Sequence, residues 1–338
     1  MKSRQKLLIL AVSVVLLLGL VAGGFGCAAK TEEGMRLNMG AGSIGSSNYI
    51  QKTAVKILVE KYTPHKITII PYASITFAVK GFEAGDADIA GIYAYQFSKP
   101  DLKADWHPRS RYLWGWWAGN LAVVALDQSD IKTFEDLRGK RIGSGPKGGM
   151  GDRTLVYLMD KMGWVAGKDY KVVNHAFIDY GKILREGTAD AFMATWSYTG
   201  AYVHDLVSTD KFREITLPEP QTGDMLKEAW GEGTFMKTMM NKGDWATVDK
   251  GYAGEFPFEA YWLSCWWGVW EDLDEDVVYD IVKAVWDHED EGLEMWAGFK
   301  YIKRPEFFNL ADQQRPFHDG ALKYYKEQGW ITESHRYS

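Results

Sequence analysis

The feature that most constrains the fold is a strand, a glycine-rich loop and a helix that follow one another twice along the chain. The first copy runs from residue 36 to 62 and the second from residue 140 to 162. In each copy the strand is short and the helix carries apolar residues at helical spacing. The two copies share this order but little sequence, so we expect each to begin a separate lobe.

Further strands and helices alternate after each copy, which indicates an α/β fold. Strands are predicted at residues 66–71, 88–93, 121–126, 170–173 and 191–194. Helices are predicted at residues 76–84, 133–138, 180–186, 277–286, 291–299 and 319–328. Because ligands of such sheets bind beyond the carboxyl ends of the strands, two lobes with matching loops predict a ligand cleft between them.

The first 27 residues have the order of a secretory signal. Lys2, Arg4 and Lys6 precede an apolar run at 7–21, and small residues then lead to Cys27. The apolar run is short for a membrane-spanning helix, which needs about 20 residues. This order resembles a bacterial lipoprotein processing site, which implies that Cys27 is the lipidated first residue of the mature chain. An uncleaved N-terminal anchor and ordinary cleavage remain as alternatives.

The predicted export of the chain determines its expected processing, location and mature composition. We expect residues 1–26 to be a signal peptide and residues 27–35 a tether. The predicted location is the periplasm or the outer face of the cytoplasmic membrane, with a lipid anchor as the only membrane attachment. After removal of the signal peptide, 36 basic and 45 acidic residues remain. They include no cluster of basic residues of the kind that binds nucleic acid.

Cysteine usage excludes a disulfide scaffold, because Cys265 is the only cysteine besides Cys27. Cys265 lies in an apolar run and is predicted to be buried rather than reactive. The chain has 338 residues, of which 46% are hydrophobic. That length and composition support two domains of ordinary size, each stabilised by its own core.

The sequence offers no pattern of catalytic or metal-binding residues. The seven histidines include no H-E-x-x-H spacing, and no G-x-S-x-G motif occurs. The acidic stretch at 271–276 lacks the spacing of a calcium loop and reads as a capped helix start. We therefore expect a protein that is not an enzyme and has no catalytic residue, metal or cofactor.

The residue pattern of the first glycine-rich loop also matches the fingerprint of dinucleotide-binding sites. Gly40, Gly42 and Gly45 give G-x-G-x-x-G after a strand. The confirming context is an acidic residue at the end of the second strand. Glu60 lies within the helix instead, and the second strand ends at Pro71. A nucleotide site is therefore not favoured.

Several segments, taken in order, resemble one family of binding proteins. The TAXI family comprises solute-binding receptors of tripartite ATP-independent periplasmic (TRAP) transporters. The segments similar to that family are residues 39–49, 84–90 with Gln96, 132–143, 144–151 and 317–329. Each segment is weak alone, but their order and spacing make the resemblance specific.

The resemblance implies a two-lobed fold like that of type II periplasmic binding proteins, with the ligand cleft between the lobes. The first lobe would contain residues 36–124 and 265–330, and the second would contain residues 125–264. Closure of the lobes about the crossing strands would bury the ligand. The implied protein is a monomer whose partners are a small-molecule solute and TRAP-type membrane permease subunits.

The two glycine-rich loops are the first candidate ligand contacts. A glycine-rich turn into a helix leaves backbone N–H groups unpaired, and these groups with the helix dipole attract an anion. Serine hydroxyls add donors to the first loop, and glycines let a ligand approach the second closely. The alternative is that the glycines only make turns and the serines only cap helices. The candidates are Gly42, Ser43, Ser46, Ser47, Tyr49, Gly148, Gly149 and Met150.

Aromatic residues are unusually frequent, with 15 Trp, 18 Tyr and 15 Phe. Packing in the core or between lobes is the ordinary explanation for such residues. The preferred cleft aromatics are Tyr93, Tyr95 and Trp196, with Trp117 and Trp267 as weaker candidates. An aromatic cleft would suit a flat ring or a quaternary ammonium group.

Polar and charged candidates complete the predicted site. Arg153, just after the second loop, could hold a carboxylate bidentately, and Lys147 lies inside that loop. A solvated surface charge is the alternative at either position. Ser74, Thr76 and Gln96 resemble the family's polar contacts.

The sequence thus predicts a receptor for a small organic anion, a carboxylate that could be aromatic or amphipathic. An exported sensor domain and an exported α/β enzyme are the alternative functions. The sequence does not identify the solute.

Overall fold

A computed structural model of the chain describes residues 34–93, 109–219, 221–230, 234–303 and 316–331. The strands are β1 (Arg36–Ala41), β2 (Lys66–Pro71), β3 (Ile89–Tyr93), β4 (Ser110–Leu126), β5 (Arg141–Gly145), β6 (Lys171–Asn174), β7 (Ala191–Trp196), β8 (Phe212–Ile215), β9 (Phe235–Met240), β10 (Phe258–Trp270) and β11 (Ile302–Lys303).

The described helices are α2 (Ser47–Tyr62), α3 (Ile75–Glu83), α5 (Met150–Lys161), α6 (Tyr180–Arg185), α7 (Ala201–Thr209), α8 (Gln221–Trp230), α9 (Ala246–Gly251), α10 (Glu275–Asp287), α11 (Glu289–Met295) and α12 (Asp319–Glu327). Short 3-10 turns lie at Glu135–Leu137, Phe177–Asp179 and Ala297–Tyr301.

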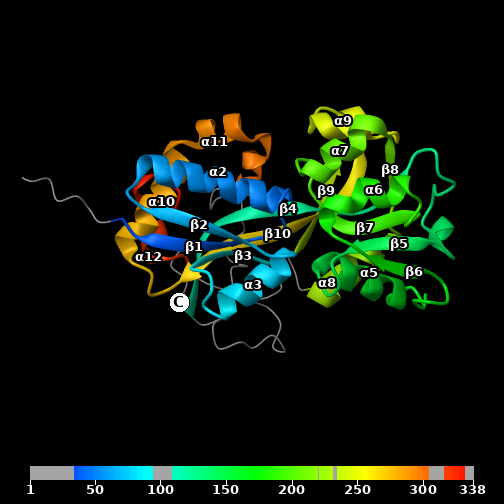
Figure 1. The fold of residues 1–338 in the computed structure, drawn as a ribbon, viewed down its shortest axis with the longest axis horizontal. Coiled ribbons are helices and arrows are strands. Elements are labelled where there is room, and N and C mark those ends of the chain that lie inside the picture. The colour runs from blue at the N-terminus through cyan, green and yellow to red at the C-terminus, as the bar shows by residue number, and fades with distance from the viewer. Residues whose placement is uncertain (1–33, 94–108, 220, 231–233, 304–315, 332–338) are drawn as a thin grey trace, which may run out of the picture. The chain divides into compact units, whose positions relative to one another are not determined.

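The strands form one mixed sheet with the main order β2-β1-β3-β10-β4-β7-β5-β6. Strands β2, β1 and β3 are parallel to one another, as are β6, β5 and β7. The long strands β10 and β4 run antiparallel between these two groups. Figure 1 shows the two parallel groups on opposite sides of the β4–β10 pair. The predicted mixed α/β fold is confirmed.

The β4–β10 pair carries the chain between the two parallel groups. Strand β4 pairs with β7 at Asn120–Val124, and β10 pairs with β3 at Cys265–Val269. The lobe boundaries expected at residues 124 and 265 therefore fall within these two strands. The division into two lobes remains a prediction.

A β-bulge interrupts the pairing of β4 with β10. Leu263 pairs with Gly119, but the next residue, Ser264, pairs with Trp117, so β4 has one extra residue there. Gly119 has a φ of 146°, a conformation that residues with a side chain rarely adopt. The bulge lies between the part of β10 that pairs with β3 and the part that pairs with β9.

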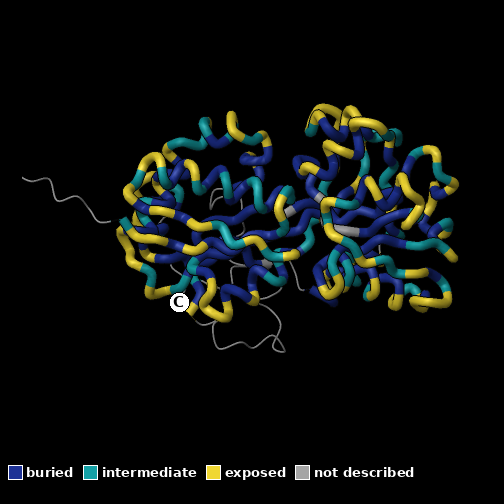
Figure 2. Tube along the Cα trace, viewed as in Figure 1, coloured by how far each residue is buried: buried dark blue, intermediate teal, exposed yellow. Residues whose placement is uncertain are grey.

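The sheet has a separate hydrophobic core on each face. Along β4, Leu121, Val123 and Ala125 belong to one buried cluster, while Ala122 and Val124 belong to another. Successive side chains of a strand point to opposite faces, so this alternation means that both faces are covered. Figure 2 shows the strands buried and most exposed residues on the surrounding helices and loops.

Local sequence explains where several helices begin. The Ser46 side chain accepts a hydrogen bond from Tyr49 N at 3.2 Å and so caps α2. Asp274 caps α10 by accepting from the backbone N–H groups of Asp276 and Val277. The acidic stretch at 271–276 is therefore a capped helix start, as expected. Cys265 is buried, also as expected.

The main differences from the predicted elements lie in the second half. Strand β4 begins at Ser110, eleven residues before the predicted strand, because a Trp- and Gly-rich segment continues it. The elements between residues 201 and 251 have no counterpart among the predicted ones. They are short, and short elements give a pattern-based prediction few residues to read.

Candidate ligand-binding site

The first glycine-rich loop connects the end of β1 to the start of α2. Gly42 N donates to Asn48 Oδ1 at 2.7 Å, and Ser46 N donates to Ser43 O at 3.0 Å. Gly45 has a φ of 82°, which glycine adopts without strain. The loop therefore folds back on the first turn of its own helix, and Ser46 serves as the cap.

The second glycine-rich loop connects β5 to α5 and already holds an anionic group of its own. The Asp152 carboxylate accepts from Gly148 N at 2.8 Å, from Ser144 Oγ at 2.9 Å and from Asn174 Nδ2 at 2.7 Å. Gly149 N donates to Pro146 O at 2.9 Å. At least part of the predicted anion-binding capacity of this loop is thus used by Asp152, a residue that the sequence reasoning did not weigh.

Loops of the two parallel strand groups meet in pairs beyond the ends of the strands. Ala201 N donates to Gly45 O at 3.2 Å, and the Ile178 side chain lies 3.2 Å from the point where a Cβ on Gly45 would be. Ser74 Oγ lies 3.7 Å from the corresponding point on Gly149. Each of the two predicted loop sites therefore meets a loop of the opposite parallel strand group.

Buried hydroxyl groups without a partner lie in these loops. Ser43 Oγ, Ser74 Oγ and Thr76 Oγ1 are inaccessible to solvent and have no hydrogen-bond partner among the described residues. Ser74 precedes α3 as its N-cap residue, yet its side chain makes no capping bond. Buried hydroxyls are almost always paired, so these groups call for a partner beyond the described residues.

The buried face of α2 is polar over its first turns, which sequence reasoning missed. Asn48 is 3% exposed, and both Gln51 and Lys52 are completely buried. A helix that packs on a sheet normally buries apolar residues at these positions. The signal in the sequence was the i, i+3, i+4 spacing of Asn48, Gln51 and Lys52 on the same face as Val55 and Val59.

Trp116 and Trp267 both belong to the buried core. Trp267 is completely buried, its Nε1 donates to Gln51 Oε1 at 3.1 Å, and its ring packs against Trp114 with centroids 4.9 Å apart. Trp116, which was not among the predicted site residues, is also buried, and its Nε1 has no partner among the described residues. Trp267 thus contacts both the core and the polar face of α2.

The remaining predicted residues lie in varied positions. Ser47 and Met150 are buried, Tyr49 is half-buried, and Lys147 and Gly148 are exposed. Tyr95 and Gln96 lie outside the described residues, as does Cys27. Tyr93, Trp117 and Trp196 lie in strands β3, β4 and β7, but their side chains are not described.

The predicted carboxylate partner, Arg153, lies on the exposed side of α5. Its guanidinium stacks over the Trp230 ring, 4.9 Å from the ring centroid. That arrangement stabilises the charge by a cation–π interaction.

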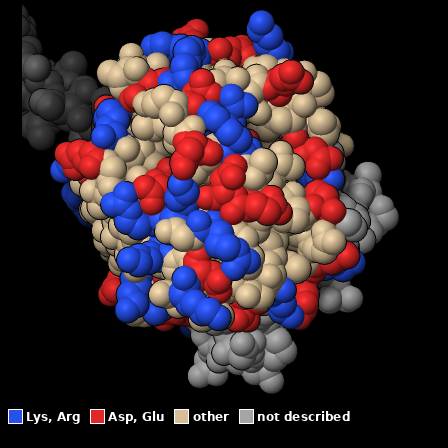
Figure 3. All heavy atoms as spheres, turned by 90° about the vertical axis from the view of Figure 1, so that its right-hand side faces the viewer, with Lys and Arg blue, Asp and Glu red and all other residues tan. Residues whose placement is uncertain are grey.

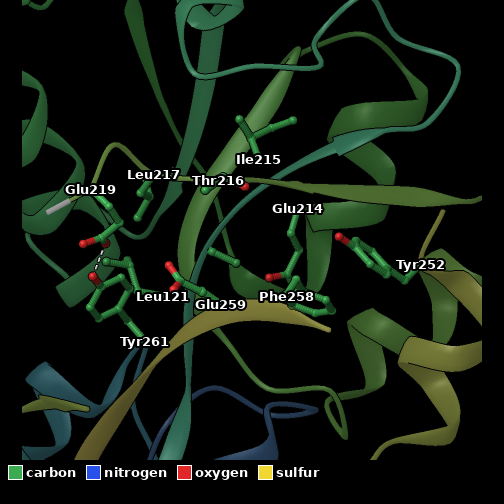
Figure 4. Close-up of a pocket in the computed structure, with 11 residues that line it drawn as sticks. Leu121, Glu214, Ile215, Thr216, Leu217, Glu219, Tyr252, Phe258, Glu259 and Tyr261 are labelled. Carbon is green, nitrogen blue, oxygen red and sulfur yellow. Dashed lines mark hydrogen bonds between the residues drawn. The ribbon is translucent and has the colours of Figure 1, made fainter. Parts of the chain in front are cut away.

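A separate cavity lies between β4, β8 and β10 (Figure 4). The carboxylates of Glu214, Glu219 and Glu259 line it, and the Tyr261 hydroxyl donates to Glu219. Burial and this hydrogen bond raise the pKa of Tyr261. None of the sequence-predicted site residues lines this cavity, and its carboxylates make it a poor site for an anion.

The surface charges are mixed. On the face drawn in Figure 3, basic and acidic side chains lie among one another and form no single basic patch. Ion pairs of this half include Arg141–Asp190 and Lys161–Glu228, each at 2.6 Å. The described residues contain no group of acidic, His and Cys side chains arranged to hold a metal ion. Among the described helices, none has the length and apolar character that crossing a bilayer requires.

Comparison with known proteins places the chain in a family and a fold class. The model of the NMT1-like family matches residues 39–250 and 262–329. No curated protein matches the chain. The family match covers both parallel strand groups and both glycine-rich loops.

Solved structures with a similar fold cover most of the chain. A protein of Bordetella bronchiseptica is 15% identical, with a TM-score of 0.53, and the alignment covers 88% of this chain and 99% of that one. The periplasmic aliphatic sulphonate binding protein of Escherichia coli is 12% identical, with a TM-score of 0.43 and coverage of 88% and 94%. A Prochlorococcus marinus protein in complex with methylphosphonate is 11% identical, with a TM-score of 0.49 and coverage of 88% and 99%. The fold is the mixed α/β fold of type II periplasmic binding proteins.

Proposed function

The chain belongs to the NMT1-like family, and from this premise we propose that it is an extracytoplasmic receptor that captures a small organic anion and delivers it to a membrane transporter. The observation that carries the proposal is the set of buried hydroxyls on Ser43, Ser74 and Thr76 without a partner among the described residues. They lie in and beside the loops where the two strand groups meet. A bound solute would supply the missing hydrogen bonds.

The proposed solute is a carboxylate with an aromatic or amphipathic body. The helix start at Ser47 and the hydroxyl groups favour an anion, and Trp267 supplies an aromatic wall. The remaining proposed contacts come from the sequence alone. They are Tyr93, Tyr95, Gln96, Trp117 and Trp196.

Capture would proceed by closure of two lobes, residues 36–124 with 265–330 and residues 125–264. The contact of Gly45 with Ala201 supports this, because it joins a loop of the first parallel group to a helix start of the second. Closure would remove the solute from water and strengthen its hydrogen bonds.

The proposed transporter is of the TRAP type, which the TAXI resemblance supports, and the proposed tether is a lipid on Cys27. Incorporation of labelled fatty acid should occur in the natural chain and be lost in Cys27→Ser. Reconstitution with TRAP permease subunits should give solute-dependent uptake. Uptake with an ABC-type permease alone would replace the TRAP assignment and leave the receptor function intact.

Binding without turnover tests the function itself. Titration of carboxylates, amino acids, sugars and ammonium compounds should reveal a solute that raises the melting temperature and changes tryptophan fluorescence. The solute should be recovered unchanged after long incubation. Formation of a product would favour the enzyme alternative over the receptor.

A further inference from the structure

The first turns of α2 place polar atoms in a wholly buried position. The Lys52 ammonium is 0% exposed and has no hydrogen-bond partner among the described residues. It lies over the Trp267 ring, 3.6 Å from the ring centroid. A ring face attracts a cation but accepts none of its three N–H donors in the way an oxygen does. An unpaired buried ammonium is costly, so an acceptor beside Lys52 would stabilise its charged form.

The side-chain amides of Asn48 and Gln51 are oriented so that only their N–H donors lack a hydrogen-bond partner among the described residues. Asn48 Oδ1 accepts from Gly42 N at 2.7 Å, and Gln51 Oε1 accepts from Trp267 Nε1 at 3.1 Å. Each side chain therefore has its oxygen occupied, while Asn48 Nδ2 and Gln51 Nε2 have no partner among the described residues. Because the hydrogen bonds fix the orientation of both amides, the free groups are N–H donors.

Gly91 leaves room for a methyl-sized group beside these donors. A Cβ on Gly91 would lie 3.5 Å from Asn48 Nδ2, 3.7 Å from Lys52 Nζ and 3.7 Å from Trp116 Cζ2. Gly91 pairs directly with Trp267 in the β3–β10 ladder, so both residues face the same side of the sheet. Three groups from α2 and β4 thus converge on a position where the strand has no side chain.

The cluster contains one basic group, Lys52, and no described carboxylate partner for it. The other titratable group beside Lys52 is the buried Cys265 thiol on β10, whose pKa burial raises well above its ordinary value. That thiol therefore stays neutral and does not balance the ammonium. One cation with several neutral donors matches a ligand that carries one negative charge and accepts several hydrogen bonds.

We propose that Asn48, Gln51, Lys52 and Trp116 form a subsite for a monoanionic oxyanion head group, a carboxylate or a sulfonate, with Lys52 as the charge that selects it. The inference rests on the proposed receptor function and assigns the head group to a defined place beside Gly91. A dianionic phosphonate would leave a surplus negative charge in this buried site. A neutral amide would leave the ammonium unpaired.

Matched pairs of probes test the head group. Benzoate and pentanoate should bind the mature protein at least tenfold more tightly than benzamide and pentanamide in titration calorimetry. Benzenesulfonate should likewise bind more tightly than benzenesulfonamide and phenylphosphonate. Comparison of benzenesulfonate with benzoate then shows whether the subsite favours a sulfonate or a carboxylate. Equal affinity for the acids and their amides would overturn the proposal.

Two variants test the residues. Lys52→Met should weaken binding of the best monoanion at least tenfold, and Gly91→Ala should weaken it while leaving Lys52 in place. The added methyl group in Gly91→Ala meets its neighbours at ordinary contact distances, so the fold should be retained. Lys56→Met is the control, because the Lys56 ammonium one turn further along α2 is already paired with Glu60 and Ile67 O. Unchanged anion affinity in Lys52→Met would remove Lys52 from the site.

Proton uptake gives an independent readout. Burial lowers the pKa of Lys52 from 10.5 to about 7, and a bound anion would raise it again. Calorimetry at about pH 8 in buffers of different ionisation enthalpy should therefore show proton uptake on binding to the natural protein and none in Lys52→Met. Binding of neutral or cationic solutes, but of no monoanion, would overturn the subsite and leave the receptor function standing. Failure of every solute class to bind would count against the receptor function itself.

Discussion

The backbone N–H of Ala201 donates to the carbonyl oxygen of Gly45 at 3.2 Å, which ties the start of α7 to the loop before α2. The Ile178 side chain packs on the same glycine. These contacts join the two parallel strand groups at a place outside the β4–β10 pair. They also bring the ends of β1 and β7 together at the proposed ligand site.

Gly45→Ala should therefore destabilise the protein by more than Gly85→Ala. Both glycines have a φ near 80°, so an added side chain costs about 1–2 kcal/mol at either position. Only at Gly45 does the new Cβ also meet a neighbour, the Ile178 side chain at 3.2 Å. Urea unfolding of the two variants measures the difference, and equal losses would show that the contact with Ile178 is unimportant.

Replacement of Lys52 by Met should stabilise the ligand-free protein at low pH, and the gain should shrink as the pH rises. Burial lowers the pKa of Lys52 to about 7, so above that pH the folded chain has released a proton that the unfolded chain still holds. The stability of the natural protein relative to Lys52→Met should thus rise by roughly 2–3 kcal/mol between about pH 6 and about pH 9. A difference that does not change with pH would show that Lys52 does not titrate there.

Asp152→Ala should lower the stability of the protein, because the Asp152 carboxylate holds the second glycine-rich loop. The Asp152 carboxylate accepts hydrogen bonds from Gly148 N, Ser144 Oγ and Asn174 Nδ2. Their loss should lower the free energy of unfolding by about 1–3 kcal/mol. Asp160→Ala is the matched control, since Asp160 lies exposed on the same helix. Similar stability of the two variants would mean that Asp152 does not hold the loop.

Two buried tyrosines should respond differently to loss of their hydroxyl groups. The Tyr198 hydroxyl donates to Glu214 Oε1 at 2.8 Å and accepts from Asn120 Nδ2 at 2.8 Å, so Tyr198→Phe should cost about 1–3 kcal/mol of unfolding free energy. The Tyr180 hydroxyl is buried without a partner among the described residues. Tyr180→Phe should be neutral or stabilising. Thermal and urea unfolding measure the stability of both variants. An equal loss of stability would contradict the different hydrogen bonding of the two hydroxyl groups.

The first half of the fold could be predicted because its local patterns agree with its packing. The predicted strand at 66–71 is β2 itself, and the predicted strand, loop and helix at 36–62 begin with β1 and end with α2 at the expected residues. These elements combine clear periodicity with a Gly/Ser loop and a serine cap. Strand β4 was predicted only from residue 121, because Gly115 and Gly119 interrupt its apolar pattern.

The candidate site was harder to predict, since it depends on contacts between distant residues. Gly42, Ser43 and Ser74 could be named from their loops. Lys52 could not, because its burial arises from β10, more than two hundred residues away in the sequence. A lysine on a helix normally keeps its ammonium in water, so the residue type favoured an exposed charge.

The bulge at Gly119 bears on how such a molecule could move. Two continuous strands, rather than flexible connectors, carry the chain between the parallel groups. Any rearrangement of one group against the other must then bend or twist these two strands, whose pairing is irregular at Gly119 and again between Trp266 and Gly268. A side chain at residue 119, where the backbone φ is one that glycine favours, should therefore change the rate of such a rearrangement.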